Sequence, residues 1–356
     1  MKILNNIVIS VIILILSLIF FLFSLFEFNL SSISNDDTLK EIVIEPGSIE
    51  MIADTLYENN LIRNKFVFKC YIQITGKTNL KAATYELSEN MDVKKIVEIL
   101  EEGNGKNTNE LNITFKEGIN MRSIAAIIAE KTDNTEDDLY NKLKDKEYIK
   151  NLINKYWFLE NVILDENIYY PLEGYLYPNT YSFASTSVSI EDIIKVMLDE
   201  TEKKLTPYKD AIELNNMSIH EIITLASITE LEGTTKEERQ NITSVFINRI
   251  NSNMNLGSDV TTYYGAKINM GDRDLYKSEV EECNNYNTRC ATFKGLPISP
   301  ISNPSMESIL SVIEPVTSNY YYFVADKNKK IYFSKNIDEH NNTIYKLKQN
   351  NLWYEY

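Results

Sequence analysis

Glu230 is the residue whose placement most suggests chemistry, because it puts a charge on a helix face that the sequence otherwise makes apolar. Ser218 and Glu221 have the three-residue spacing of a capping box, which starts a helix. At about 100° per residue, Glu230 projects within roughly 20° of the centre of the face formed by Ile219, Ile222, Ile223 and Ala226. Glu221 and Glu232 point to the opposite side.

This placement predicts a general acid. A carboxyl group turned toward apolar packing has a raised pKa, since burial disfavours its charged form, so it can hold a proton near neutral pH and donate it. The alternative for Glu230 is a structural glutamate at a helix end, either snorkelling to solvent or paired with a cation.

Two loop segments carry side chains suited to a sugar. In residues 172–181 the tyrosine rings, Tyr177 among them, can stack on sugar rings while Glu173 bonds hydroxyl groups. Tyr286, Asn287 and Thr288 offer phenol, amide and hydroxyl groups to a neutral ligand rich in acetamido and hydroxyl groups. The alternatives are a tyrosine-rich turn packed on the domain and a plain surface loop.

A third segment alternates polar side chains. Asp259, Thr261 and Tyr263 follow one another at every second position, and we expect this stretch to be extended, which places the three on one side. A structural Asx turn at Asp259 is the alternative.

The bulk composition bounds the class of protein. At 356 residues the chain is long enough for two or more globular units. Its formal net charge of −15 would repel a phosphate backbone, which excludes nucleic acid as the expected partner. Three cysteines and two histidines cannot form a zinc centre of the usual spacing, and Cys283 and Cys290 either close a short loop or stay reduced.

A membrane anchor is predicted at the N-terminus. Residues 7–26 are almost entirely apolar and long enough as a helix to cross a hydrocarbon core of about 30 Å. A cleaved signal peptide is the alternative, but no small-residue cleavage site follows. Lys2 precedes the span and acidic residues follow it, so we expect the remainder of the protein to lie outside the cytoplasm.

The rest of the chain predicts an α+β protein. After a cytoplasmic stub and anchor (1–30) and a polar linker (31–40), a strand, a turn and an amphipathic helix recur three times, at 42–56, 84–100 and 113–128. We therefore expect an α+β subdomain over 41–132, a charged helical connector over 133–157 and an α+β domain over 158–356. The first two repeats resemble the sugar-binding LysM-type module, and a plain spacer is the alternative.

Several segments in order resemble one family. They are Leu225 to Glu230, Ser244 to Ile250, Leu256 to Gly265, Tyr286 to Thr288, Gly295 to Pro297, Ile301 to Pro304 (which includes Asn303), Tyr322 to Ala325, His340 with Asn341, and Glu173 to Tyr181. This set is similar to the membrane-anchored endolytic murein transglycosylases, the YceG-like or MltG family. The chain departs from the family pattern at Gly257, Val260, Arg289, Ile298, Ser299 and Ser305.

The resemblance implies an enzyme without cofactor or metal that cuts the β-1,4 bond between MurNAc and GlcNAc in peptidoglycan strands. Glu230 would protonate the glycosidic oxygen and then take the proton of the C6 hydroxyl, giving a 1,6-anhydro end and ending strand growth. Around the substrate the resemblance and the loops place Glu173, Tyr177, Asp259, Thr261, Tyr286, Asn287, Thr288 and Asn303.

Two rival functions remain open at this point. One is a hydrolytic muramidase, in which Asp259 or Glu173 acts as a second carboxylate beside Glu230. The other is a noncatalytic, membrane-tethered peptidoglycan-binding scaffold. A cell-wall synthesis complex would be a fitting protein partner for either an enzyme or a scaffold at the membrane.

Overall fold

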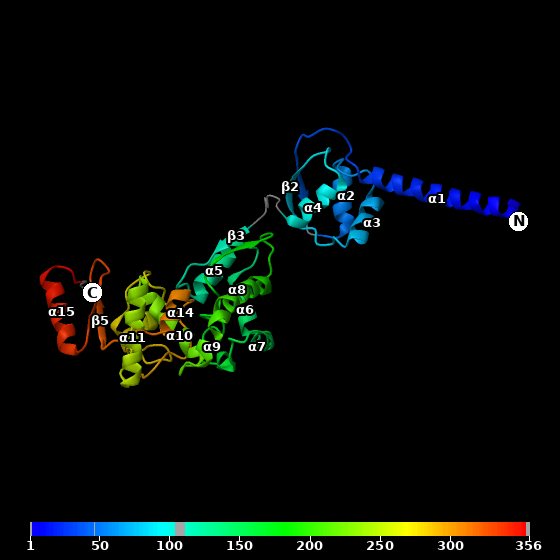
Figure 1. Ribbon diagram of the computed structural model, residues 1–356. Coiled ribbons are helices and arrows are strands. Elements are labelled where there is room, and N and C mark those ends of the chain that lie inside the picture. The colour runs from blue at the N-terminus through cyan, green and yellow to red at the C-terminus, as the bar shows by residue number, and fades with distance from the viewer. Residues whose placement is uncertain (1, 46, 104–110, 354–356) are drawn as a thin grey trace. The chain divides into compact units, whose positions relative to one another are not determined.

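The computed structural model describes residues 2–45, 47–103 and 111–353, with the backbone alone at residues 2–9, and the chain forms two compact units. Unit 1 covers residues 1–110 and unit 2 covers residues 111–356 (Figure 1). The subdomain expected over 41–132 therefore ends earlier, because its third strand and helix pack with unit 2. Residues 46 and 104–110 of that expected subdomain lie outside the described residues.

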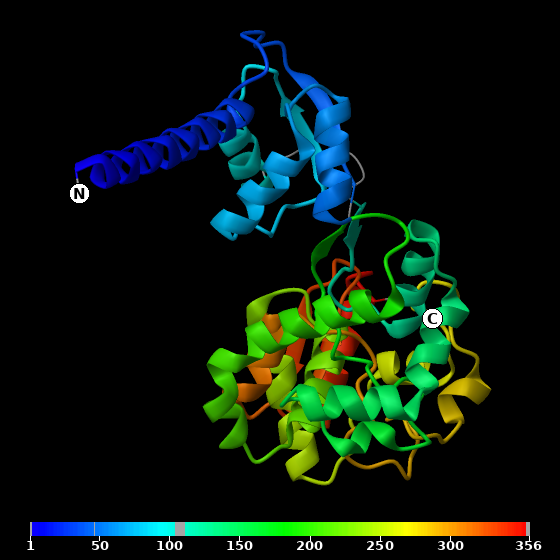
Figure 2. The same cartoon turned by 90° about the vertical axis from the view of Figure 1, so that its right-hand side faces the viewer.

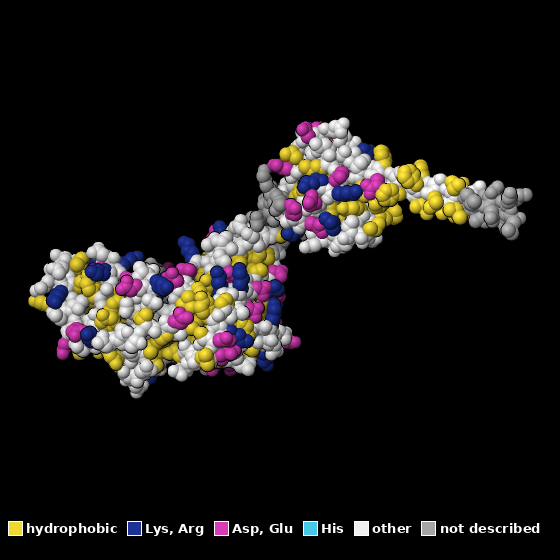
Figure 3. Space-filling view, viewed as in Figure 1, with side chains coloured by type: hydrophobic (Ala, Val, Ile, Leu, Met, Phe, Trp, Pro, Cys, Tyr) yellow, Lys and Arg dark blue, Asp and Glu magenta, His cyan; other side chains and the backbone are white. Residues whose placement is uncertain are grey.

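Unit 1 begins with α1 (Lys2–Leu30). Its segment Ser10–Leu30 is long and apolar enough to cross a membrane, and the most apolar stretch of this segment is not buried in the protein. Figure 3 shows hydrophobic side chains along the described part of this helix. A helix of this kind is compatible with the predicted span and also with a signal sequence.

The end of α1 is part of the core of unit 1. Leu30 is buried in that core and Phe26 packs against it. The residues that follow, which we expected as a polar linker, contact unit 1 as well, since Arg63 Nη2 donates to the carbonyl of Ser32 at 2.6 Å. Ser34 Oγ donates to Glu89 at 3.1 Å.

Two strands and three helices complete unit 1. The strands pair antiparallel, with Lys40 opposite Leu87 and Ile44 opposite Ala83. The apolar faces of the helices pack against this sheet, and Ser48, Asn64 and Asp92 cap their N-termini. The elements are β1 (Lys40–Ile44), α2 (Ile49–Glu58), α3 (Lys65–Thr75), β2 (Ala83–Leu87) and α4 (Val93–Glu102).

Unit 2 opens with the third predicted strand and helix, β3 (Leu111–Thr114) and α5 (Met121–Lys131). Strand β3 pairs antiparallel with β4 (Thr180–Phe183), with Leu111 opposite Phe183. This pairing across 66 or more residues joins the third repeat to unit 2. The charged connector is two helices, α6 (Glu136–Lys144) and α7 (Lys146–Lys155), which meet at Asp145.

The helices at the centre of unit 2 begin where the capping signals place them. Ser218 and Glu221 form a capping box at the start of α10 (Ile219–Glu232), and Thr235 and Glu238 form another at α11 (Lys236–Asn251). Helix α10 packs against α11 and α14 (Met306–Ile313). Figure 2 shows the chain turned by 90° from the view of Figure 1, with α14 in orange. The remaining helices before α12 are η1 (Asn161–Leu164), α8 (Ile190–Leu205), η2 (Thr206–Tyr208) and α9 (Lys209–Glu213).

The expectation of an extended stretch at Asp259 to Tyr263 is wrong. These residues begin the short helix α12 (Asp259–Gly265), which packs against α10 with Val260, Thr261 and Tyr264 buried. Tertiary packing overrides the alternating pattern in so short a segment.

The C-terminal part contains a last helix and, before it, a hairpin, which the strand-like runs 320–325 and 330–334 and the turn residues between them predict. Strands β5 (Tyr322–Ala325) and β6 (Ile331–Ser334) pair antiparallel, and α15 (Ile337–Gln349) follows. Before them, α13 (Lys277–Glu281) precedes a loop that a disulfide between Cys283 and Cys290 closes.

Candidate active site

Glu230 lies in polar surroundings and not in the apolar ones that we expected. Its Oε1 accepts from Arg239 Nη2 at 2.8 Å. Its Oε2 accepts from the main-chain nitrogen of Ser305 at 2.9 Å and from the hydroxyls of Ser305 and Ser308 at 2.5 and 2.6 Å. The side chain is only 4% exposed. The Glu230 carboxyl group is therefore engaged by four donors and buried.

These contacts come from two neighbouring helices. Arg239 is on α11, and Ser305 is the N-cap of α14, whose N-terminus favours a negative charge. One carboxylate thus joins α10, α11 and α14. The apolar face did not reveal this because α10 is buried on nearly all sides, including the polar Thr224 and Ser227. The alternative of a paired glutamate describes the geometry.

Glu232, the last residue of α10, has the features of a general acid. It is half-buried, and its Oε1 accepts from Ser258 Oγ at 2.6 Å. Burial raises the pKa of Glu232 to about 7, and the nearby Asp259 carboxylate adds to this rise, while the Ser258 hydrogen bond and Arg289 oppose it. The end of a helix also disfavours a negative charge.

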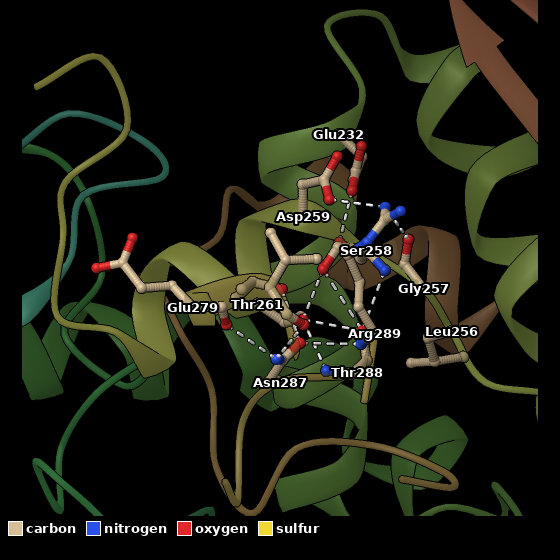
Figure 4. Close-up of polar contacts among 12 residues, drawn as sticks. Glu232, Leu256, Gly257, Ser258, Asp259, Thr261, Glu279, Asn287, Thr288 and Arg289 are labelled. Carbon is tan, nitrogen blue, oxygen red and sulfur yellow. Dashed lines mark hydrogen bonds and ion pairs between the residues drawn. The ribbon is translucent and has the colours of Figure 1, made fainter. Parts of the chain in front are cut away.

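Asp259 and Arg289 lie beside Glu232 at the surface (Figure 4). Arg289 Nη1 donates to Asp259 Oδ1 at 2.7 Å, and both side chains are exposed. The three charged groups come from the end of α10, the start of α12 and the disulfide-closed loop. A substrate that reaches Glu232 would therefore meet one carboxylate and one guanidinium group next to it.

Three buried side chains lie beneath this surface and contact it, namely those of Thr261, Thr288 and Asn287. Thr288 Oγ1 accepts from the main-chain nitrogen of Ser258 at 3.0 Å and lies 2.8 Å from Thr261 Oγ1. Asn287 Oδ1 accepts from Thr262 Oγ1 at 2.7 Å. All three predicted site residues are fully buried, so they hold the Ser258 loop and the start of α12 in place beneath Glu232 (Figure 4).

Glu173 and Asn303 form a separate buried cluster. The Glu173 carboxyl accepts from the main-chain nitrogen of Met121, at the start of α5, at 2.9 Å, and from Tyr264 Oη at 3.0 Å. Asn303 Nδ2 donates to Glu173 at 3.2 Å. Burial raises the pKa of Glu173 to about 7, against the opposing hydrogen bond from Met121. Both side chains are inaccessible to a polymer.

The two predicted tyrosines differ in exposure. Tyr286 is fully buried, with its phenol oxygen 3.0 Å from Ser299 Oγ and accepting from the main-chain nitrogen of Tyr169 at 3.0 Å. Tyr177 is half-buried, and Lys204 Nζ lies 5.4 Å from the centre of its ring. Of the predicted binding residues, Asp259 and Tyr177 are thus the ones with side chains that a ligand can reach.

The residue that sequence reasoning missed is Glu232. The helical wheel places Glu232 on the side opposite the apolar face. A usable signal was its position as the last residue before Gly233, two residues after Glu230, where a helix ends and its carboxyl group can face a loop.

Comparison with known proteins agrees with the ordered motifs. Residues 42–346 match the YceG-like family. The chain belongs to the YceG-like family. A solved YceG-like protein from Listeria monocytogenes is 33% identical, with a TM-score of 0.61 over 87% of this chain and 100% of that chain.

Curated relatives of this YceG-like chain carry an enzyme name. It is 36% identical to the endolytic murein transglycosylase of Bacillus subtilis, over 83% of this chain and 81% of that protein. It is 31% identical to the endolytic murein transglycosylase of Streptococcus pneumoniae strain D39, over 84% of this chain. The aligned region spans 56% of the pneumococcal protein.

Proposed function

We propose that this protein is a membrane-anchored endolytic lytic transglycosylase that cuts peptidoglycan strands and leaves 1,6-anhydroMurNAc ends. The observation that carries the proposal is Glu232, a half-buried carboxyl group whose pKa is raised to about 7 beside exposed Asp259 and Arg289. The names of the curated relatives support the reaction class.

Glu232 acts twice in the proposed reaction. In its neutral form it donates its proton to the oxygen of the β-1,4 bond between MurNAc and GlcNAc, and the bond from that oxygen to C1 of MurNAc breaks. The resulting carboxylate takes the proton of the C6 hydroxyl of the same MurNAc as its oxygen bonds to C1. The proton count is balanced and no water is consumed.

Glu232 takes the catalytic role in this proposal, in place of Glu230. A general acid must give up a proton to the substrate, and Glu230 is enclosed by Arg239, Ser305 and Ser308 in the interior. Ser258 orients the Glu232 carboxyl group through its 2.6 Å hydrogen bond.

Hydrolysis is the second candidate, and Asp259 is the observation that favours it. Asp259 is close enough to Glu232 to raise its pKa. A glycosidase that uses water usually has a pair of carboxyl groups in its active site. Asp259 Oδ1 lies 2.7 Å from Arg289 Nη1.

The remaining parts of the proposal concern location and binding. Helix α1 anchors the protein as a single span with both units outside the cytoplasm, and the substrate is nascent peptidoglycan near the membrane. Unit 1, with its order strand, helix, helix, strand, helix, is a LysM-like module that binds glycan. The cut ends strand growth, and a cell-wall synthesis complex is the proposed protein partner.

Mass spectrometry of the products tests the function. The full chain in detergent is incubated with uncrosslinked peptidoglycan, beside the variants Glu232→Gln and Glu230→Gln. We expect anhydro ends from the wild type and none from Glu232→Gln. Products heavier by one water would show hydrolysis. An intact polymer with wild-type protein that binds it would support a noncatalytic scaffold.

A further inference from the structure

The outer side of α3 carries a stripe of apolar side chains. Phe66 and Ile74 are 70% and 76% exposed, and Cys70, which lies between them, is half-buried and outside the disulfide. Residues four positions apart are neighbours on a helix surface, so the three follow one another along one side of α3. Phe68 and Ile72, on the opposite side, are fully buried in the core of unit 1. The core of unit 1 therefore does not account for the outer stripe.

Helix α3 lies where the apolar helix α1 joins unit 1, and the two helices pack together (Figure 1). The guanidinium carbon of Arg63, just before α3, lies 4.8 Å from the centre of the Phe28 ring. Near the start of α4, Lys94 Nζ lies 3.0 Å from a carboxylate oxygen of Glu27. Figure 3 shows hydrophobic side chains on unit 1 close to the place where α1 leaves it.

Unit 1 begins directly at the end of the predicted span, residues 7–26. The polar layer on each side of a hydrocarbon core is about 5–7 Å thick, and a helix crosses it in about four or five residues. Counted from the end of the span, this layer reaches Leu30, whose side chain is buried in the core of unit 1. With α1 across the membrane, the side of unit 1 that contains α3 therefore lies at the depth of the lipid headgroups.

Lipid is the occupant that these surroundings supply for the stripe. Helices at a membrane surface insert their apolar side into the boundary of the acyl chains and keep lysines among the headgroups. Lys65 flanks the stripe and pairs with Asp54 of α2 at 2.7 Å. Lys69 flanks it as well and pairs with Glu50 of α2 at 2.5 Å. Because carboxylates offset both charges, apolar burial and not attraction to anionic lipid is the expected driving force.

We propose that the stripe of Phe66, Cys70 and Ile74 inserts into the headgroup layer of the membrane beside α1, which makes α3 a second membrane contact of this protein. The inference rests on the part of the proposed function that makes α1 a single span. A single span is free to tilt, and contacts at the membrane surface limit this tilt. The stripe thus fixes the side of unit 1 that faces the lipid.

Cys70 supplies the probe for the test, because the other two cysteines form the disulfide. The full chain, labelled at Cys70 with a nitroxide, is placed in phosphatidylcholine nanodiscs that hold one chain each. Electron paramagnetic resonance measures how often the label collides with oxygen, which dissolves in lipid, and with a nickel chelate, which stays in water. We expect frequent collisions with oxygen and few with the chelate.

A label at position 43 is the matched control, introduced as Val43→Cys together with Cys70→Ser. Val43 is an apolar residue of β1 that is 47% exposed. Its neighbours Ile42 and Ile44 are buried on the side of the sheet that faces the helices, so Val43 points away from α3. This label should collide freely with the nickel chelate.

Replacing the two exposed side chains tests whether the stripe carries the contact. In Phe66→Ser with Ile74→Ser, collisions of the Cys70 label with the chelate should rise to the level of the control label. Both side chains are exposed, so we expect the core of unit 1 to stay folded. Val43→Ser should leave the Cys70 measurement unchanged.

Two results with the wild type would overturn the contact. A Cys70 label that is open to the nickel chelate would place the stripe in water. A label that is closed to both collision partners would mean that protein covers α3. Flotation with phosphatidylcholine vesicles after an alkaline wash reports on α1 separately. A protein that does not float refutes the span and the stripe together, whereas one that floats with an open Cys70 refutes the stripe alone.

Discussion

We propose different roles for two glutamates that lie two positions apart on α10, and substitution can separate these roles. Glu232→Gln removes the group that transfers the proton while leaving its shape and its contact with Ser258. We expect cleavage of peptidoglycan to fall by about 10²- to 10⁴-fold, the usual worth of a general acid. Circular dichroism should show an intact fold. A variant with wild-type turnover would remove Glu232 from the reaction.

Glu230→Gln should act on stability first. The substitution leaves Arg239 without its buried ionic partner between α10 and α11. Removing one partner of a buried ion pair destabilises a protein by about 3–5 kcal/mol. The remaining contact of Arg239 with Glu307 at 2.9 Å should offset part of this destabilisation. Urea unfolding measures the change. Full stability together with lost activity would return the catalytic role to Glu230.

The pH dependence of cleavage follows from the pKa of Glu232. The raised value of about 7 means that the free enzyme holds the proton below this pH and loses it above. We therefore expect kcat/KM to fall as pH rises through about 7, since the reaction begins with a neutral acid. The profile is measured on peptidoglycan between pH 5 and 9. A rate that stays flat through pH 7 would contradict this assignment.

At the scale of secondary-structure elements, Glu173 makes the packing of α5 sensitive to pH. Its pKa is raised from 4.5 to about 7, because burial penalises the charged form even though Met121 donates to it. Below about pH 4.5 the group is neutral in both folded and unfolded states and costs nothing. Between about 4.5 and 7 the unfolded chain loses the proton first, so the stability of unit 2 falls as pH rises, by about 3 kcal/mol in all.

Glu173→Gln tests this dependence, because glutamine cannot ionise. Urea unfolding at pH 5 and pH 8 should show a smaller loss of stability across this range in the variant than in the wild type. Glu232, whose pKa is also raised, contributes in the same direction, so a residual slope is expected. An unchanged slope in Glu173→Gln would contradict the assignment.

At the scale of the whole molecule, the end of the apolar helix α1 is built into the core of unit 1. Leu30→Ala removes a side chain that is 2% exposed and should destabilise unit 1 by about 2–5 kcal/mol. Unit 2 has its own core and should be unaffected. Hydrogen exchange of the full chain in detergent would show faster exchange confined to residues 40–102.

Leu25→Ala is the control for this change, since Leu25 lies on the same helix but is 49% exposed. It should leave the exchange of unit 1 unaltered. Equal effects of the two variants would mean that α1 is joined to unit 1 by the chain alone.

The elements of this protein follow from local sequence signals. Capping boxes at Ser218 and Thr235 begin α10 and α11, and the hairpin of β5 and β6 stands where alternation and turn residues predict it. These signals depend on a few neighbouring residues, so they can be recognised in the sequence before the fold is known. Family membership also came from the sequence, because the ordered motifs are a property of the chain and a match over 42–346 confirms it.

Only the tertiary structure decided which side chains contact Glu230 and Glu232. A helical wheel places Glu230 among apolar residues, but only the packing of α11 and α14 shows that Arg239 and Ser305 enclose it. The proton-donor features of Glu232 depend on Ser258 and Asp259, which lie 26 and 27 positions along the chain. Helix α12 replaced an expected extended stretch because it packs on α10. Burial and electrostatic neighbours set a pKa, and both are made by residues distant in sequence.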